Sequence, residues 1–471
     1  MNGRFLKPLA LAVGLLLAGC ATSPTPADSP EKTLQRAAVP AQLPAGAGAA
    51  TDTPADTPTD TPAYGWRDLV RQPRLAQLVE LALQGNRDLR VTVLNVQRAQ
   101  AQLNAAEANR LPTLGAGLTA GRIPNSQAGQ ANAFALGLQV SSWELDFFGR
   151  LAKLSESARA QWLASQAGQR AAELALAAAV VQTALVLQAD DELLVLARQS
   201  LASREQSLKL AQLRESVGAA SLLDLQLQQG LAAQARATLA QLTRQQAQNA
   251  HTLALLLGRP VPPALLSTVD SPPLESDAWL AEVPAGLSST VLLRRPDVIA
   301  AEQTLRAADA NIAAARAAFW PAITLTGQAG QASPQLSGLF QGGNFAYTLA
   351  AQALITVFDA GRRQATVDAA TANRDIAQAQ YERAIQSAFR DTADGLAGLA
   401  TWRDQRLAVA AQREAARGSS RLVELRIRQG AASMLEQLEV ERSLWATEQA
   451  VVQVRLAELL NRVALFKALG G

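Results

Sequence analysis

An internal repeat constrains the fold of this 471-residue chain more than any other sequence feature. Three short motifs recur at a common spacing of 212 residues: Gly149-Arg150 with Gly361-Arg362, Gly218-Ala-Ala-Ser with Gly430-Ala-Ala-Ser, and Leu257-Gly258 with Leu469-Gly470. Repetition of this kind is typical of a duplicated structural unit. It predicts two similar halves, residues 64–258 and 291–471, joined by an extended linker over residues 259–290.

Each half contains a long span without proline, residues 150–257 and 362–469. Ala, Leu, Gln, Arg and Glu dominate both spans, and these residues favour helix. Each span is interrupted once, where a glycine can end one helix and a serine three residues later can cap the next. We therefore expect two helical hairpins. A first arm of roughly 65 residues would extend about 100 Å, which suits a structure that reaches across a compartment.

Before each helical span, apolar residues alternate with small or polar ones, as in Leu114, Ala116 and Leu118. This pattern predicts β-hairpins over about residues 113–145 and 322–358, of the kind found in membrane β-barrels. Four strands cannot close a barrel, since known barrels begin at about eight strands, and lipid offers no partner to an open sheet edge. We expect several copies to share one barrel that continues into a helical cylinder. A soluble coiled-coil scaffold is the alternative.

The N-terminal residues predict export and lipid attachment. Arg4 and Lys7 precede an apolar run that ends at Ala18, and Cys20 follows. The run is shorter than the ~20 residues that span a bilayer, which favours a cleaved signal over residues 1–19. This segment resembles the bacterial lipobox, and the resemblance implies acyl chains on Cys20 and outer-membrane sorting. Residues 20–63, rich in Pro, Thr, Ala and Asp, are predicted to form a disordered tether.

Composition argues against catalysis. His251 is the only histidine and Cys20 the only cysteine, so zinc sites, Ser-His-Asp triads and Cys-His pairs lack their residues. Without residues 1–19 the basic and acidic side chains nearly balance, so the high isoelectric point does not indicate nucleic-acid binding. We expect a protein that is not an enzyme, with no metal, no nucleic-acid partner and no cofactor beyond covalent lipid on Cys20.

Several segments resemble the TolC-like outer-membrane factors, in particular their lipoprotein branch of efflux-pump outer channels and NodT-type lipoproteins. The matching residues are Val283-Pro-Ala-Gly-Leu-Ser288, Leu292-Leu-Arg-Arg-Pro-Asp-Val298, Ala313 to Pro321, Phe358 to Arg362 and both Gly-Ala-Ala-Ser turns, with Ser288 where the family usually has Pro. The resemblance implies a lipid-anchored homotrimer with a shared barrel in the outer membrane and a helical tunnel through the periplasm. A periplasmic adaptor protein and an inner-membrane pump would be its partners.

The implied function is export of drugs or other small toxic compounds, with type I protein secretion as the alternative. In the family, the helical turns form the closed periplasmic tip, and acidic residues just after them line the constriction. A ring of like carboxylates in a narrow pore attracts cations and repels anions. Each of these acids could instead lie on a solvated helix face. The matching gate positions are Asp224, Leu435 as an apolar plug, Glu436, Glu439 and Arg442 as a tether; the turn residues expected to contact the adaptor are Gly218, Ser221, Gly430 and Ser433.

The two turns are not equivalent in sequence. At the 212-residue spacing, Leu227 and Gly230 stand in the first copy where the second copy has Glu439 and Arg442. We therefore expect only one turn, the second, to carry the main gate.

Overall fold

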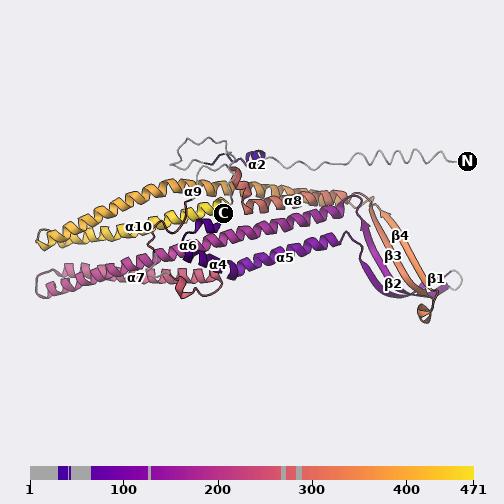
Figure 1. Ribbon diagram of the computed structural model, residues 1–471, viewed down its shortest axis with the longest axis horizontal. Coiled ribbons are helices and arrows are strands. Elements are labelled where there is room, and N and C mark those ends of the chain that lie inside the picture. The colour runs from indigo at the N-terminus through magenta and orange to yellow at the C-terminus, as the bar shows by residue number, and fades with distance from the viewer. Residues whose placement is uncertain (1–29, 41, 44–64, 126–128, 267–271, 283–288) are drawn as a thin grey trace.

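The computed structural model describes residues 30–40, 42–43, 65–125, 129–266, 272–282 and 289–471. Figure 1 shows an elongated body with a four-stranded sheet at one end and two helical hairpin tips at the other. The predicted signal segment and Cys20 lie outside the described residues.

The two halves contain equivalent elements, which confirms the predicted repeat. In each half, a 22-residue helix leads into two strands, then a 67-residue helix and a shorter returning helix. The first half contains α3 (Trp66–Leu69), α4 (Pro73–Gly85), α5 (Arg87–Ala108), β1 (Leu114–Asn125), β2 (Gly129–Leu145), α6 (Arg150–Ser216) and α7 (Leu222–Leu257). After η1 (Pro263–Leu265), the second half contains η2 (Ser289–Arg294), α8 (Pro296–Ala317), β3 (Ala322–Ser333), η3 (Leu336–Phe340), β4 (Phe345–Leu354), α9 (Arg362–Arg428) and α10 (Met434–Ala468).

The four strands form one antiparallel sheet in the order β1-β2-β3-β4. Residues directly opposite each other point to the same face of a sheet. Leu118 pairs with Leu136, Leu138 with Ala329, and Ala329 with Tyr347, so one face is apolar across all four strands. An irregularity between Val140 and Trp143 shifts the register of β2 against β3. It keeps both of these side chains on the apolar face.

The predicted second hairpin was too long at its C-terminal end. Its alternation continues through Ile355 and Val357, but β4 ends at Leu354. Leu354 pairs with Ala322, the first residue of β3. Beyond that pair, the part of the chain that the structure describes offers no neighbouring strand to accept or donate backbone hydrogen bonds, so the segment leaves the sheet.

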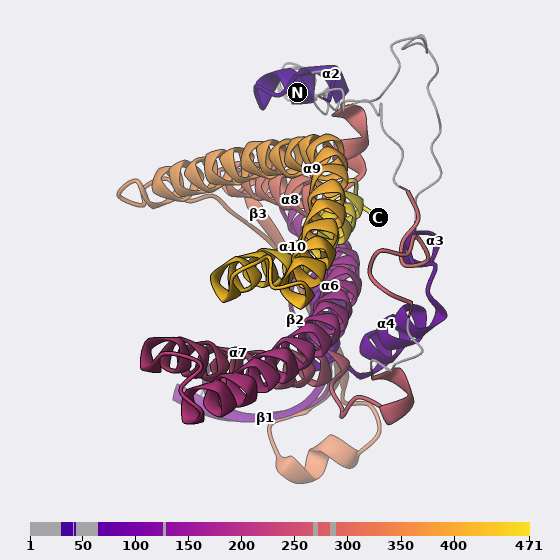
Figure 2. The same cartoon turned by 90° about the vertical axis from the view of Figure 1, so that its left-hand side faces the viewer.

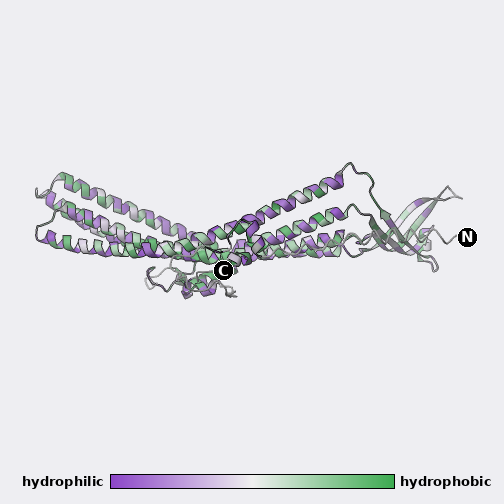
Figure 3. Ribbon diagram, turned by 90° about the horizontal axis from the view of Figure 1, so that it is seen from above, coloured by the Kyte–Doolittle hydropathy of each residue, from purple (hydrophilic) through white to green (hydrophobic). Residues whose placement is uncertain are grey.

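The helical arms lie side by side in a curved layer in the order α9, α10, α6, α7, with α3 and α4 on its convex side (Figure 2). Hydrophilic and hydrophobic residues are interleaved along the arms (Figure 3). One 18-residue window of α6 is apolar enough to cross a membrane by length and composition, but half of it is buried in the protein. That window belongs to the core.

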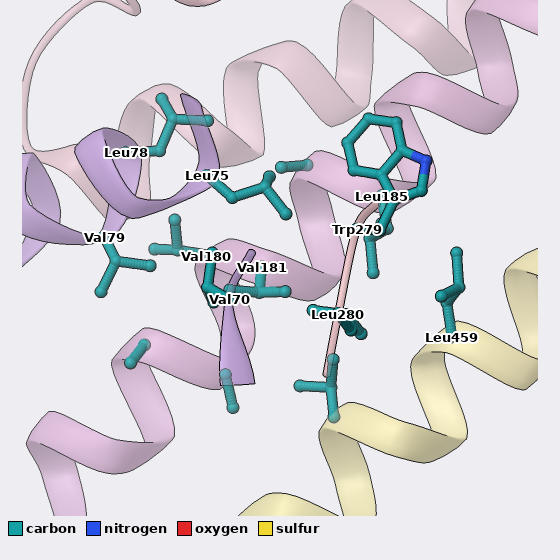
Figure 4. Packing of buried hydrophobic residues seen from close by; sticks show 14 of the residues in the cluster. Val70, Leu75, Leu78, Val79, Val180, Val181, Leu185, Trp279, Leu280 and Leu459 are labelled. Atoms are coloured by element: carbon teal, nitrogen blue, oxygen red, sulfur yellow. The ribbon is translucent and has the colours of Figure 1, made fainter. Parts of the chain in front are cut away.

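The main hydrophobic core lies where α4, α6, α10 and the linker between the halves meet (Figure 4). The linker was predicted only as an extended connection, yet the Trp279 side chain is fully buried and its Nε1–H donates to the Pro273 carbonyl at 3.1 Å. Leu280 forms a bridge with Val70. The linker therefore helps to build the core. Residues labelled in the core are Val70, Leu75, Leu78, Val79, Val180, Val181, Leu185, Trp279, Leu280 and Leu459.

A buried arginine fastens the linker to the last helix. Arg455 donates from Nε to the Leu274 carbonyl at 2.8 Å and from Nη2 to Asp277 at 2.8 Å. Its Nη1 donates to Glu458 at 2.7 Å. A fully buried guanidinium is tolerated because its donors are hydrogen-bonded and its charge is paired. Arg455 thus holds the linker against α10.

The prediction of a disordered tether over residues 20–63 was wrong for part of that range. Residues Pro30–Arg36 form helix α2, and Leu34, Ala37 and Val39 are buried. They pack against η2, α8 and α9, where Ile385 and Ala388 are also buried. These three apolar side chains bury enough surface to order a segment whose average composition favours disorder.

The tight contact between the ends of α4 and α7 gives a stability prediction. Gly258 has φ +68°, and a Cβ there would lie 2.1 Å from the Gly85 carbonyl oxygen. Gly218 has a similar φ of +74° with open space around it. We expect Gly258→Ala to cost ~1–3 kcal/mol more than Gly218→Ala, because only the former displaces packed backbone. Thermal unfolding of the detergent-solubilised variants measures this difference; equal midpoints would contradict it.

Candidate functional site at the helical tips and the membrane face

Both helical tips are built by the same local structure. Gly218 and Gly430 adopt left-handed φ values of 74° and 70°, which glycine reaches without strain. The next residue then donates back into the helix just ended: Ala219 N–H to the Arg214 carbonyl at 2.7 Å, and Ala431 N–H to the Arg426 carbonyl at 2.8 Å. This ending satisfies carbonyl groups that a helix end leaves free.

Each returning helix begins with a capping box. In the first tip, Ser221 Oγ accepts from the Asp224 N–H at 3.1 Å, and Asp224 Oδ2 accepts from the Ser221 N–H at 3.2 Å. In the second tip, Ser433 Oγ accepts from the Glu436 N–H at 3.2 Å, and Glu436 Oε2 accepts from the Ser433 N–H at 3.1 Å. The serine caps were predicted from the sequence. That the two acids complete the caps was not, although serine followed three residues later by an acid is the known signal.

The second tip carries ion pairs. Arg426 Nη1 lies 3.0 Å from Glu436 Oε1, and its Nη2 donates to the Ala431 carbonyl at 2.9 Å. Arg442 Nη2 lies 2.7 Å from Glu439 on the same helix. Sequence reasoning missed Arg426, although a basic residue in the last turn of a helix is a recognised C-terminal signal. The tether expected at Arg442 is, within this chain, a local pair with Glu439.

These contacts lower the pKa of both capping acids. The Ser221 hydroxyl, and then its backbone N–H, hold the pKa of Asp224 below its ordinary value. The Ser433 backbone N–H, followed by the charge of Arg426, lowers the pKa of Glu436. Both carboxylates are therefore charged at neutral pH.

The remaining gate candidates are solvent-exposed in the single chain. Leu435 is 73% exposed, and both Glu439 and Arg442 have largely exposed side chains. Among the described residues, no hydrogen bond or ion pair joins Asp224 to the acids of the second tip. The single chain thus places all five gate candidates at one end of the molecule, and among them the one ion pair that the described residues form is Glu439 with Arg442.

A buried ion pair that sequence reasoning missed joins the two hairpins above the tips. Arg204 Nη1 of α6 lies 3.1 Å from Glu441 Oε2 of α10, and both side chains are largely buried. The partners come from different repeats, so no local periodicity could have revealed the pair. Among the described residues, no group of three or more His, Cys, Asp or Glu could hold a metal ion.

The opposite end of the molecule presents a surface suited to lipid. The apolar sheet face is bordered by aromatic side chains at the strand–helix junctions, and Phe148 stacks on Trp320 with ring centroids 5.3 Å apart. A second group of aromatic residues, Phe340, Phe345 and Tyr347, lies toward the other end of the strands and is exposed. Two aromatic belts around an apolar band are typical of transmembrane β-barrels.

The other sheet face is small and polar. Gly117, Gln139, Gln328 and Thr348 are paired or adjacent across the strands on this face. A Cβ at Gly117 would lie 3.3 Å from the amide of Gln139, so the glutamine side chain lies over the glycine. Such a face suits a water-filled interior.

Comparison with known proteins identifies relatives of the whole folded body. The family model described as "Outer membrane efflux protein" matches residues 78–259 and 287–471. The chain is 39% identical over 418 residues to the probable efflux pump outer membrane protein TtgC of Pseudomonas putida, covering 86% of this chain and 85% of the relative.

Solved structures agree. A membrane protein from Pseudomonas aeruginosa is 37% identical, with a TM-score of 0.82 and coverage of 86% of this chain and 94% of that protein. The Neisseria gonorrhoeae outer membrane channel MtrE, solved in its open state, is 34% identical, with a TM-score of 0.76 and coverage of 86% and 91%.

The capping boxes generate a prediction for the tips. We expect Ser433→Ala to lower hydrogen-exchange protection in the first turn of α10 about fivefold at neutral pH, because losing an N-cap costs ~1 kcal/mol. Acidification should have a similar effect in the unsubstituted protein. The lowered pKa values mean that the carboxylate contribution is complete above the unfolded-state pKa and is lost as pH falls through the folded-state values.

Protection in the middle of α7 provides the control, since it is remote from both caps. Uniform loss of protection along the helices, or no change at the tip after Ser433→Ala, would contradict this assignment.

Proposed function

The chain belongs to the outer membrane efflux protein family, and we propose that it forms the outer-membrane channel of a tripartite efflux system for drugs or other small toxic compounds. One observation carries the proposal: a sheet with one apolar face continues directly into helical arms of 67 residues. At 1.5 Å per residue, each arm extends about 100 Å. The sheet is suited to the outer membrane and the arms to the periplasm.

We propose that three copies assemble around one pore. Within the described chain, the outer edges of β1 and β4 have no strand partner. Lipid cannot satisfy those backbone groups, so β1 of one copy must pair with β4 of another. The curved layer of helices would then continue the barrel as a tunnel, with its concave side toward the lumen (Figure 2).

The gate in this proposal lies at the tips. Three copies would bring Asp224, Glu436 and Glu439 into rings of carboxylates, with Leu435 as an apolar constriction beside them. The Arg426–Glu436 and Arg442–Glu439 pairs support a closed arrangement that a change of charge or of partner can loosen. The second tip carries these pairs, so it would control opening.

The tips would also meet the partner proteins. The turns at Gly218 to Ser221 and Gly430 to Ser433 are the part of the body farthest from the sheet (Figure 1). Beside the first turn, Val217, Leu222 and Leu223 are exposed apolar side chains. An apolar, exposed tip suits docking of a periplasmic adaptor that links this channel to an inner-membrane pump.

Lipid attachment to Cys20 is part of the proposal. Its support is the Leu17-Ala-Gly-Cys20 motif after a short apolar run. Helix α2 packs on α9 and η2 beside the middle of the body, so its own position is fixed. Mass spectrometry of the mature N-terminal peptide would detect acyl chains on Cys20, and an unmodified thiol would remove the anchor.

The relatives favour efflux over type I protein secretion, because several of them are named as efflux pump outer membrane proteins. Deleting the gene should increase sensitivity to small toxic compounds and raise dye accumulation, with both restored by the intact gene. A deletion strain that keeps its drug resistance but fails to release a secreted protein would favour the secretion channel instead.

The gate itself can be tested by conductance. We expect Glu436→Ala combined with Glu439→Ala to raise conductance in a planar bilayer and to reduce cation preference. Each chain would lose two carboxylates, both of their ion pairs and the carboxylate half of one capping box. The matched control is Glu205→Ala, which removes an exposed ion pair with Arg236 on the arms, away from the turns. Conductance and selectivity equal to those of the control would exclude the two glutamates from the gate.

A further inference from the structure

Three arginines at the strand–helix junctions have no role in the fold or in the proposed gate. Arg110 lies just after α5 and before β1, Arg316 in the last turn of α8 before β3, and Arg362 at the first position of α9 after β4. We call these three residues the junction arginines. All three are exposed, and their guanidinium groups have no ion pair or side-chain hydrogen bond to any residue that the structure describes.

Their neighbours place the junction arginines beside the apolar face of the sheet. The indole N–H of Trp143, a residue on that face, donates to the Arg110 carbonyl at 3.0 Å. Arg316 lies one helical turn before Trp320, which is exposed and stacked on Phe148. Arg362 follows Phe358, which is 85% exposed. Each junction arginine is thus near an aromatic residue of the belt nearest the helices, by a backbone contact at Arg110 and by a spacing of four residues at Arg316 and Arg362.

The nearby acids do not neutralise the junction arginines, because each has another partner. Glu144 pairs with Arg150, and Asp146 accepts the backbone N–H groups of Leu151 and Ala152 at 3.1 and 2.7 Å. Asp359 binds Arg363 at 2.7 Å. The other two acids are Glu107, 3.8 Å from Arg159, and Glu156, 2.6 Å from Lys153. The junction therefore carries uncompensated positive charge.

The opposite rim of the sheet differs. Among its described residues, the basic side chain is Arg122, and its Nε donates to Asn132 Oδ1 at 3.1 Å. Positive charge without a protein partner is therefore concentrated at the helical end of the strands, which faces the periplasm. The lipid headgroups at that depth belong to the inner leaflet of the outer membrane.

We propose that the junction arginines bind the headgroup phosphates of anionic glycerophospholipids in the inner leaflet. A guanidinium matches a phosphate in charge and in hydrogen-bonding geometry. The aromatic belt would hold the glycerol and upper acyl region beside it. This arrangement would retain a shell of anionic lipid at the junction where the strands become helices.

Native mass spectrometry of the detergent-purified channel, titrated with phosphatidylglycerol or phosphatidylcholine, tests the proposal. We expect the unsubstituted protein to retain phosphatidylglycerol in preference to phosphatidylcholine. The triple variant Arg110→Gln, Arg316→Gln, Arg362→Gln should retain it at least ~10-fold less well, since each basic side chain near a lipid surface contributes roughly fivefold. The matched control is Arg122→Gln, which removes one arginine from the other rim and should bind as the unsubstituted protein does.

Two further measurements keep the result interpretable. The triple variant must keep the oligomeric mass and the lipid-free thermal unfolding midpoint of the unsubstituted protein. Lys at the same three positions keeps the charge but not the planar fork of donors, so it should recover part of the binding. Competition with inorganic phosphate distinguishes a lipid site from a simple anion site. Equal lipid retention by the triple variant, equal retention of both lipids, or full displacement by millimolar phosphate would overturn the proposal.

Discussion

Unpaired backbone at the edges of a four-stranded sheet is the constraint on which the rest of this structure depends. The sheet has a mainly apolar face that extends across all four strands from β1 to β4, so it is suited to lipid. Lipid, however, supplies no donor or acceptor to the outer edges of β1 and β4. A chain with this sheet cannot be stable in a membrane alone. The repeat gives each chain two β-hairpins, so the strands that close the barrel must come from other copies.

The strand–helix junctions fix the helical arms relative to the strands of the closed sheet. At the first junction, Asp146 caps α6 and Glu144 pairs with Arg150 in its first turn. At the second, Arg363 pairs with Asp359 and lies over the Phe319 ring at 5.0 Å. The Phe148–Trp320 stack joins the two junctions to each other. Because strand ends and helix starts are fixed together, the position of the strands sets that of the arms.

Stability is then distributed unevenly along the arms. The core around Trp279 and the buried Arg455 fix the middle of α6 and α10. Toward the tips the helices are mostly exposed, and cohesion rests on the caps, the Arg204–Glu441 pair and local ion pairs. Exposed pairs contribute little each, with a median near 0–1 kcal/mol. If the channel opens at its tips as proposed, the part that opens is the part that costs least to rearrange.

Local chemistry could be predicted from the sequence, and long-range packing could not. The turns at Gly218 and Gly430 follow from the conformational freedom of glycine and the capping preference of serine, and the strands follow from period-two alternation. Trp279 and Leu34 are buried against helices that are distant in the sequence. The composition of their own segments therefore did not predict that these segments pack into a core. The end of β4 depended on where β3 begins. Likewise, Arg295 Nη1 donates to the Ala468 carbonyl at 2.7 Å and joins α8 to the end of α10, a contact between residues far apart in the sequence.

The most direct test of shared closure is the oligomeric mass of the protein after extraction from membranes in mild detergent, measured by native mass spectrometry. We expect a trimer that stays assembled whether or not Cys20 carries a lipid, because strand pairing between copies holds it together. A folded body that remains monomeric, dissolves without detergent and leaves a bilayer impermeable to ions would contradict the requirement from which the channel is inferred.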